Sequence, residues 1–378
     1  MSFFDHLKST LFGCVRFIGI LVFLVSLFFI MRDYSGIQFQ HNRILQISRL
    51  PKSLHSQPSD LKHKKSHKKI KETNGRDQCL TEHFNDILFV AAFGAMLDYE
   101  SIPLFEVMYK KVFRNRLYCG PEYMKQTASK SAIFIKQNTR YGAFLYDCLT
   151  QVLKNHNNYT GYIFVSESTI VNPKKLATLN KNYIWESNRT ELGPTLYGQI
   201  PNTSEWWTSP WGMQAIEKLY EYLTEVSYYN IRKTKMTEGR WTPEWDIGQV
   251  LNNWLWNGKG EFGTYWSQET FLYLPKRYTS LYLNITKHAR PSGVRHEIAL
   301  PTLVRMIELD SSIQKLSTGV ISKSDKFVLD KRDLFEEMMG TNDLVYVTGK
   351  RNEKNKILNH LTFKEHGVGE FLKYNDCK

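Results

Sequence analysis

The stretch Gly161-Tyr-Ile-Phe-Val-Ser-Glu-Ser-Thr-Ile-Val171 decides the predicted fold of this chain. Its apolar run, residues 162–165, is entered from a polar turn rich in asparagine and stops abruptly at Ser166. A short apolar run between polar residues predicts a buried strand that delivers its last side chains to the edge of a sheet. Ligands of open α/β sheets bind at such an edge. Ser166, Glu167 and Ser168 are therefore the first candidate binding residues.

The chain on both sides of this strand alternates between strand-like and helix-like patterns. Continuous apolar runs of strand length occur at residues 86–93, 117–119, 132–136 and 183–185. Apolar residues at three-to-four spacing predict helices at residues 102–113, 141–154, 210–223 and 245–256. Later segments are predicted as strands at residues 271–277 and 281–285, and as a helix interrupted by Pro301 at residues 296–308. The order predicts an α/β fold built from βαβ units with right-handed crossovers.

A tryptophan-rich segment follows the central strand. Its members are Trp206, Trp207, Trp211, Trp241, Trp245, Trp254, Trp256 and Trp266. The simpler interpretation is that these indoles fill the core of a helical insertion, and the alternative is a platform on which sugars stack. Residues 258–263 match the pattern G-x-G-x-x-G, but they follow a helical segment instead of a strand. A dinucleotide site needs a strand, a turn and then a helix, so we do not predict a cofactor loop here.

The N-terminal part of the 378-residue chain predicts a membrane protein with a stem. We expect a short tail at residues 1–10, a transmembrane signal anchor at residues 11–31, a basic disordered stem at residues 32–78 and one globular domain at residues 79–378. The formal net charge is +13, and much of it lies in a lysine-rich run at residues 61–71 of the stem. Such a run is typically solvated, so nucleic acid is not an expected partner.

The orientation of this anchor is open from sequence alone. Basic residues are more numerous after the apolar segment than before it, which opposes a lumenal domain under the positive-inside rule. Four glycosylation sequons favour a lumenal domain, and they begin at Asn158, Asn188, Asn202 and Asn284. Four cysteines outside the anchor, Cys79, Cys119, Cys148 and Cys377, allow three pairings into two disulfides. We expect a lumenal domain, with a basic anchored protein facing the cytosol as the alternative.

Several motifs occur in an order that is similar to a known family. They are Asp86-Ile-Leu-Phe-Val-Ala-Ala-Phe93, Ser101-Ile-Pro-Leu-Phe105, the stretch that begins at Gly161, Tyr273-Leu-Pro-Lys-Arg277 and His296-Glu-Ile-Ala-Leu-Pro-Thr302. Across roughly residues 85–310 the chain resembles the plant STELLO proteins and their eukaryotic relatives. That family is Golgi-resident and glycosyltransferase-like, with an N-terminal membrane anchor. The resemblance implies a GT-A-like, Rossmann-like nucleotide-sugar fold, here with the tryptophan-rich helical insertion.

The resemblance also implies where donor binding and catalysis would occur. The family's strand usually ends in paired aspartates, which can hold a divalent metal against a diphosphate, whereas this chain has Ser166, Glu167 and Ser168. Manganese or magnesium is therefore expected only if Glu167 supports a residual site, and basic side chains could bind the diphosphate instead. The basic candidates for donor binding are Lys276, Arg277, Arg290 and Arg295. Surface charge in an already basic protein is the competing explanation for them.

Glu297 is the candidate catalytic base, because it corresponds to the family's acidic residue before the Ala-Leu-Pro-Thr-like motif. An inverting glycosyl transfer needs such a base for the acceptor hydroxyl. A glutamate in the first turn of a helix also stabilises the helix dipole, which is the structural alternative for Glu297. The expected activity is transfer of a sugar from a nucleotide donor to a glycan or glycoconjugate in the Golgi lumen. The alternative is a catalytically degenerate relative that acts as a partner or assembly factor for other membrane enzymes.

Overall fold

The computed structural model describes residues 80–121, 132–196, 210–240, 245–267, 270–321 and 345–348. The predicted tail (1–10), anchor (11–31) and stem (32–78) lie outside the described residues, as do Cys79, Asn202 and Cys377. Among the described helices, none is both long enough and apolar enough to span a bilayer.

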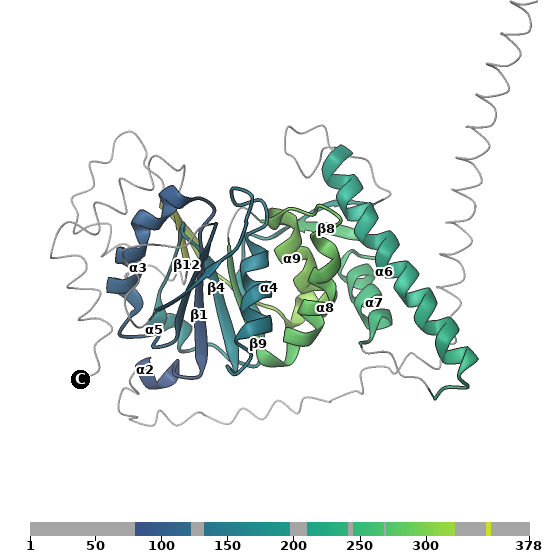
Figure 1. Ribbon diagram of the computed structural model, residues 1–378, viewed down its shortest axis with the longest axis horizontal. Coiled ribbons are helices and arrows are strands. Elements are labelled where there is room, and N and C mark those ends of the chain that lie inside the picture. Colours follow the sequence, from purple (N-terminus) through teal and green to yellow (C-terminus); the bar gives the residue numbers. More distant parts are fainter. Residues whose placement is uncertain are drawn as a thin grey trace, which may run out of the picture. The chain divides into compact units, whose positions relative to one another are not determined.

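A seven-stranded sheet in the order β10-β6-β9-β4-β1-β2-β3 forms the centre of the fold (Figure 1). Its strands are β1 (Ile87–Ala92), β2 (Arg116–Gly120), β3 (Ala132–Lys136), β4 (Gly161–Ser166), β6 (Trp185–Ser187), β9 (Phe271–Pro275) and β10 (Gln314–Leu316). Strands β1, β2, β3 and β4 are mutually parallel, β9 is antiparallel to both β4 and β6, and β10 is parallel to β6. The predicted mixed α/β fold with a mostly parallel central sheet is confirmed, and this sheet is compatible with a Rossmann-like fold.

Both faces of the sheet are covered, which explains why its strands are continuous apolar runs. Helices α3 (Ile102–Tyr109) and α5 (Pro173–Leu176) cover one face, where Phe89 and Ile163 are buried. Helices α4 (Tyr146–Asn155), α8 (Thr279–Ala289) and α9 (His296–Ile307) cover the other, where Val90 and Phe164 are buried. Alternate side chains of one strand therefore enter two separate apolar clusters, as the period of a strand requires.

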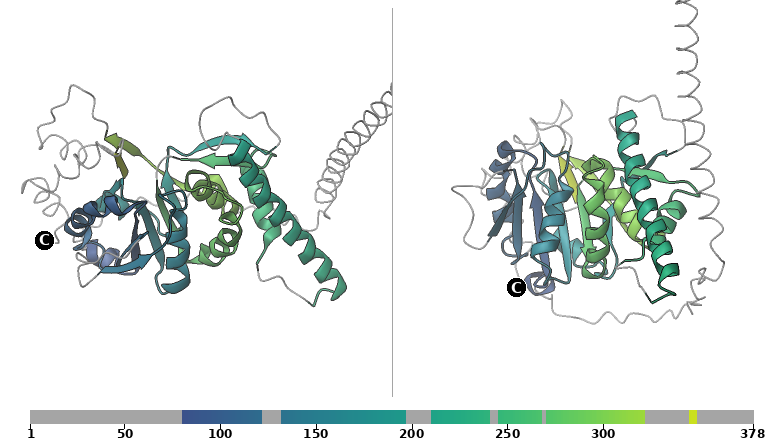
Figure 2. Two further views of the ribbon diagram at one scale, coloured as in Figure 1. Left: turned by 45° about the horizontal axis from the view of Figure 1, so that its top comes forward. Right: turned by 45° about the vertical axis from the view of Figure 1, so that its right-hand side comes forward.

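The remaining described elements are short or lie outside this three-layer core. They are α2 (Leu80–His83), η2 (Met96–Ser101), β5 (Thr169–Val171), β7 (Glu191–Thr195), α6 (Pro210–Met236), α7 (Ile247–Asn257), β8 (Gly263–Trp266), η4 (Lys276–Tyr278), η5 (Asp310–Ser312), β11 (Thr318–Ile321) and β12 (Val345–Thr348). Strands β11, β12 and β5 form a second sheet, and β7 pairs with β8. Helix α6 lies against α7 and α8 at the side of the core (Figure 2).

The strand predicted at residues 281–285 is wrong, because this segment belongs to helix α8. Its alternating leucines and isoleucine resemble a strand pattern, but the side chains that are buried are Tyr282, Ile285 and Ala289. Their three- and four-residue spacing is that of one helix face. Short apolar runs are ambiguous between the two periods, and packing against α4 and α9 decides for the helix.

The interruption predicted at Pro301 is also wrong, because α9 runs through that residue. Proline lacks the N–H that would bond the carbonyl of Glu297 four residues earlier. The backbone N–H of Ser267 donates to that carbonyl instead, at 2.9 Å. The acceptor that proline leaves without an intrahelical partner is thus satisfied by a neighbouring segment.

The tryptophan-rich segment is partly core and partly surface. Elements β7, α6, α7 and β8 are inserted between β6 and β9, in agreement with the predicted helical insertion. Trp254 is fully buried, whereas Trp211 and Trp256 are 73% and 76% exposed. Gly258 follows α7 and precedes β8, so the G-x-G-x-x-G match lies between a helix and a strand and is not a dinucleotide loop.

Cys119 of β2 and Cys148 of α4 form a fully buried disulfide with a sequence separation of 29 residues. Closing a loop of this length in the unfolded chain lowers its entropy, which corresponds to about 3–4 kcal/mol of stability. We therefore expect the variant Cys119→Ala/Cys148→Val to lose about that free energy of unfolding in urea titrations. A reductant should lower the stability of the wild type toward that of the variant and leave the variant unchanged. Equal denaturation midpoints for oxidised wild type and variant would contradict this prediction.

Candidate functional site

The strand order places the topological switch point of the sheet between β1 and β4. The chain moves outward from β1 to β2 and β3, and then returns to the opposite side of β1 as β4. Ala92 and Ser166, the last residues of these two parallel strands, are register partners, and the N–H of Glu167 donates to the Ala92 carbonyl at 3.0 Å. Ligands of open α/β sheets bind outside the carboxyl ends of the strands at this point. The predicted site residues Ser166, Glu167 and Ser168 lie there.

The segment between β3 and α4 crosses this edge and is tied to both sides of the switch point. The hydroxyl of Thr139 donates to the carbonyl of Gly94 just after β1, at 3.0 Å. At Gly94, an added Cβ would lie 3.3 Å from the backbone of Gly142, so the two chains approach closely. The N–H of His296 donates to the carbonyl of Ala143 at 2.8 Å, which brings the start of α9 to the same edge.

A second chain of contacts joins β4 to the start of α9 through Thr270. The N–H of Ser166 donates to the Thr270 carbonyl at 3.2 Å, and the Thr270 hydroxyl lies 2.7 Å from Nε2 of His296. His296 is buried beside the rings of Tyr146 and Phe164. Burial lowers the pKa of His296 to about 3, so its imidazole is neutral at physiological pH. His296 therefore positions the adjacent Glu297 by packing and hydrogen bonding.

The carboxyl group of Glu297 lies in a partly desolvated environment. Burial raises the pKa of its carboxyl group, although its own backbone N–H and Arg295 act in the opposite direction. Its Oε2 atom is buried and has no hydrogen-bond partner. A carboxylate whose pKa is raised is a better proton acceptor, as a general base requires. The main-chain bond from Ser267 to the carbonyl of Glu297 fixes this residue at the edge of a neighbouring pocket.

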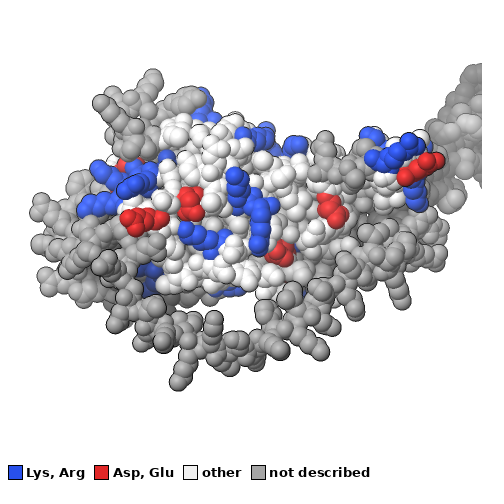
Figure 3. Space-filling model, turned by 90° about the horizontal axis from the view of Figure 1, so that it is seen from below, with Lys and Arg blue, Asp and Glu red and all other residues white. Residues whose placement is uncertain are grey.

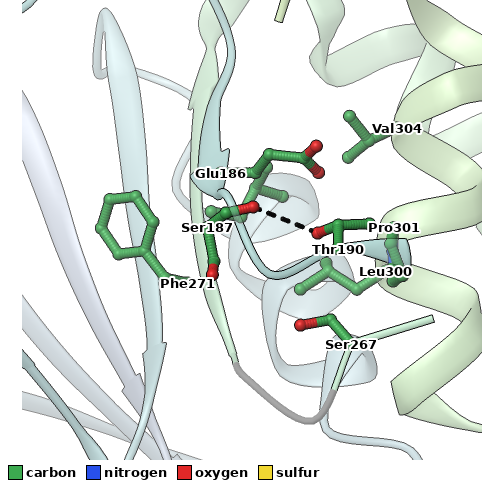
Figure 4. Close-up of a pocket in the computed structure, with 9 residues that line it drawn as sticks. Glu186, Ser187, Thr190, Ser267, Phe271, Leu300, Pro301 and Val304 are labelled. Carbon is green, nitrogen blue, oxygen red and sulfur yellow. Dashed lines mark hydrogen bonds between the residues drawn. The ribbon is translucent and has the colours of Figure 1, made fainter. Parts of the chain in front are cut away.

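That pocket lies between the end of β6 and the first turns of α9 (Figure 4). Its lining combines the hydroxyl side chains of Ser187, Thr190 and Ser267 with apolar groups of Phe271, Leu300, Pro301 and Val304 and with Glu186. The space that it encloses is small, with room for no more than about one water molecule. Sites for drug-sized ligands typically have roughly 300–1,000 Å³, so this pocket by itself is not such a site.

Two of the predicted basic residues lie at the opposite edge of the sheet. Pro275, at the end of antiparallel β9, is the register partner of Gly161 at the start of β4, and the N–H of Lys276 donates to the Thr160 carbonyl. Lys276 and Arg277 are exposed there, about five residues of strand away from Ser166. Figure 3, which views the molecule from below, shows basic side chains spread over that face in separate groups with acidic residues between them.

The other two arginines lie on the side of the switch point. Arg290 forms an ion pair with Asp147 of α4, and its guanidinium lies 4.9 Å from the centre of the Phe144 ring. Arg295 is exposed and immediately precedes the buried His296. The structure therefore brings Ser166, Glu167, Ser168, Arg295 and Glu297 to one edge and does not bring Lys276 or Arg277 to it. Of the two arginines, Arg290 has a structural role between α4 and α8.

The residues at the end of β4 are a poor fit for a divalent metal. The hydroxyl groups of Ser166 and Ser168 lie 2.8 Å apart and hydrogen bond to each other, and that of Ser166 also lies 3.2 Å from the Thr169 hydroxyl. Glu167 supplies the one carboxylate of residues 166–168, which is the fewest that magnesium sites in proteins use together with substrate phosphates. Within the described residues, no group of three His, Cys, Asp or Glu side chains could hold a metal ion.

Three of the four sequons lie within the described residues. Asn158, before β4, and Asn188, directly after β6, are exposed, whereas Asn284 is half-buried inside helix α8. The side chain of Asn284 accepts a hydrogen bond from Lys287 at 3.5 Å. Asn158 and Asn188 are therefore the better placed of these acceptors.

Sequence reasoning missed the contribution of the segment before α4 and of Thr270. Neither carries a motif, and Thr270 follows a segment of ordinary composition. Thr270 contacts His296, which lies 26 residues later in the chain, and Thr139 in the segment before α4 contacts Gly94, which lies 45 residues earlier. Only the close glycines, Gly94 and Gly142, give a local signal of a tight backbone approach.

The fold and the site define a mixed α/β protein with a ligand edge at the switch point of a mostly parallel sheet. No protein-family model matches this chain, and no curated protein matches it significantly.

Proposed function

We propose that this chain is a GT-A-like glycosyltransferase of the Golgi lumen that transfers a sugar from a nucleotide donor to a glycan or glycoconjugate without a tightly held metal. The observation that carries the proposal is Glu297, a carboxyl group with a raised pKa at the switch-point edge. A carboxylate that burial partly desolvates reduces stability, and groups with perturbed pKa values are found mostly where function requires them. In this scheme Glu297 accepts the proton of the acceptor hydroxyl while the diphosphate leaves.

The donor diphosphate would lie over the ends of β1 and β4. Arg295 and the hydroxyl groups of Ser166 and Ser168 supply donors for its oxygen atoms, since arginine binds phosphate directly. The pocket beside Ser267 has room for about one water molecule and lies next to the Ser267–Glu297 contact. In this arrangement Lys276 and Arg277 have no role in sugar transfer, because they lie at the opposite edge of the sheet.

Two observations support a lumenal location. Disulfides form and persist in oxidising compartments and are rare in the cytosol, and Cys119–Cys148 is a buried disulfide. Two sequons, at Asn158 and Asn188, are on exposed connections. Together with the apolar segment at residues 11–31, they support a single-pass type II glycoprotein with a signal anchor.

The second candidate function is a catalytically degenerate GT-A-like protein that acts as a partner of other membrane enzymes. Ser166 and Ser168 favour it, because they stand where the resembling family usually has metal-binding aspartates. This alternative requires the fold and the surface but not the protonation chemistry of Glu297. Turnover therefore distinguishes it from the first proposal.

Nucleoside diphosphate binding to the purified full chain tests the proposed function. We expect binding with similar affinity in manganese and in a metal chelator, because the donor set at β4 does not require the ion. Arg295→Ala should weaken binding about 10-fold or more, since hydrogen bonds to charged groups contribute about 1.5–3 kcal/mol. Arg277→Ala is the matched control at the opposite edge and should leave the affinity unchanged. Absence of binding in both conditions contradicts the proposal.

A further inference from the structure

The segment that leads into α4 contains consecutive residues in the left-handed region. Arg140 has φ 47°, Tyr141 has φ 58° and Gly142 has φ 95°. Among the described residues, the other non-glycine positions with positive φ are Glu238 and Lys259, which follow the ends of α6 and α7 and are each followed by a glycine with positive φ. A left-handed residue after a helix is a common helix end, whereas a bulky side chain in this conformation within a loop is a conformational outlier. Such outliers reduce stability and cluster at ligand-binding sites.

The ring of Tyr141 is 94% exposed even though its loop is fixed on both sides. The Phe144 N–H donates to the Thr139 carbonyl at 3.0 Å, and Arg290 donates to the carbonyl of Asn138 at 3.3 Å. The contacts of Thr139 with Gly94 and of Ala143 with His296 hold the same loop to β1 and α9. The aromatic face is therefore held in solvent by a backbone that is bonded to three other segments.

This loop leaves β3 at its carboxyl end, which is the ligand edge of the sheet. It belongs to the half formed by β1, β2 and β3, whereas Glu297 and the Ser267 pocket belong to the half formed by β9, β6 and α9. In a doubly wound sheet a nucleotide lies across the switch point between the two halves. A donor whose sugar lies beside Glu297 would extend its nucleoside toward the first half, where Tyr141 stands.

We infer that Tyr141 is the stacking surface for the base of a nucleoside diphosphate, an inference that rests on the proposed function. An exposed aromatic ring on a fixed loop can cover the face of a planar base with little loss of backbone entropy, since only the two side-chain torsions of Tyr141 become ordered on binding. Arg140, the adjacent exposed residue, adds positive charge near the diphosphate. Stacking accepts any base, because every base has an aromatic face, so this residue increases affinity more than base selectivity.

The test compares ligands with and without a base on the full chain. Affinities of uridine diphosphate, guanosine diphosphate and methyl diphosphate are measured for wild type, Tyr141→Ala and Tyr141→Phe by titration calorimetry. We expect Tyr141→Ala to weaken both nucleoside diphosphates by about 5- to 150-fold, the range reported by alanine substitution of stacked aromatics. Tyr141→Phe should retain wild-type affinity, and methyl diphosphate should bind all three proteins equally.

Two further variants control for the loop and for exposed tyrosines in general. Tyr141→Gly suits the left-handed conformation, so it should unfold at the same or a higher temperature than wild type while it loses affinity like the alanine variant. Tyr183→Ala removes a 44% exposed tyrosine at the opposite edge of the sheet and should not change affinity. Unchanged nucleoside diphosphate affinity of Tyr141→Ala overturns the inference and leaves the proposed function standing. Equal weakening of methyl diphosphate also overturns it, and absence of all binding by wild type overturns both.

Discussion

The variant Glu297→Gln is expected to be more stable than wild type at neutral pH and to lose transferase turnover by about 10²- to 10⁴-fold, the usual contribution of general acid–base catalysis. Burial raises the pKa of the Glu297 carboxyl group in the folded chain, and Arg295 offsets this only in part. Glutamine keeps a similar shape but neither ionises nor accepts a proton. The same substitution therefore removes a destabilising charge and the proposed base.

The sign of the pH dependence follows from the direction of this pKa shift. The unfolded chain releases the Glu297 proton at about its ordinary pKa of 4.5, whereas the folded chain holds it to higher pH. The contribution of Glu297 to stability is consequently complete below about pH 4.5 and falls as the pH rises from there through the folded pKa. Urea titrations across this range should show the fall in wild type and its absence in Glu297→Gln.

The matched control is Glu261→Gln, which changes an exposed glutamate in the same way. It should leave turnover and the pH dependence of stability as they are in wild type. If Glu297→Gln retained wild-type turnover, the residue would have only the structural role of a helix N-terminal acid. If it retained the wild-type pH profile of stability, Glu297 would not ionise in a buried site.

Replacing Arg305 by methionine is expected to reduce the free energy of unfolding by about 3–5 kcal/mol, the usual effect of removing one partner of a buried ion pair. Arg305 is 1% exposed, and its guanidinium forms a two-point contact with the buried Glu186 carboxylate. It also pairs with Asp310 at 2.7 Å and lies 4.1 Å from the centre of the Tyr265 ring. Methionine fills similar space but leaves the Glu186 charge without its main partner.

A double-mutant cycle measures the interaction energy between Glu186 and Arg305 separately from their contacts with other residues. Glu186→Gln/Arg305→Met should be less destabilised than the sum of the two single variants, because neither charge is then left buried alone. Arg240→Met, in the exposed pair with Glu238, is the control and should change stability by less than about 0.5 kcal/mol. Additive losses in the cycle would show that Lys315, which also pairs with Glu186, is sufficient for that carboxylate.

Local patterns predicted most of the sheet, because strands that are buried on both faces are continuous apolar runs in the sequence. The runs at residues 86–93, 132–136 and 162–165 became β1, β3 and β4 with only small changes at their ends. Segments with one buried face were harder to assign. The alternation of residues 281–285 predicted a strand. The segment is helical because Tyr282, Ile285 and Ala289 are buried on one helix face, and α8 packs against α4 and α9.

Some residues of the candidate site could be predicted from local sequence patterns, whereas others are placed by long-range contacts. A polar end to a buried strand is a local property, so the position of Ser166, Glu167 and Ser168 at the ligand edge was readable directly from the residues. The direction of β9 was not readable, because an apolar run has the same pattern in either orientation. Its antiparallel pairing with β4 carries Lys276 and Arg277 to the far edge.

The environment of Glu297 and of Tyr141 was decided only in three dimensions. Both depend on partners far along the chain: Ser267 and Thr270 approach α9 from the start of β9, and Gly94 and His296 hold the loop before α4. The physical reason is that a pKa or the exposure of a ring depends on every group packed around it, whereas a strand buried on both faces is already indicated by the apolar run of its own side chains.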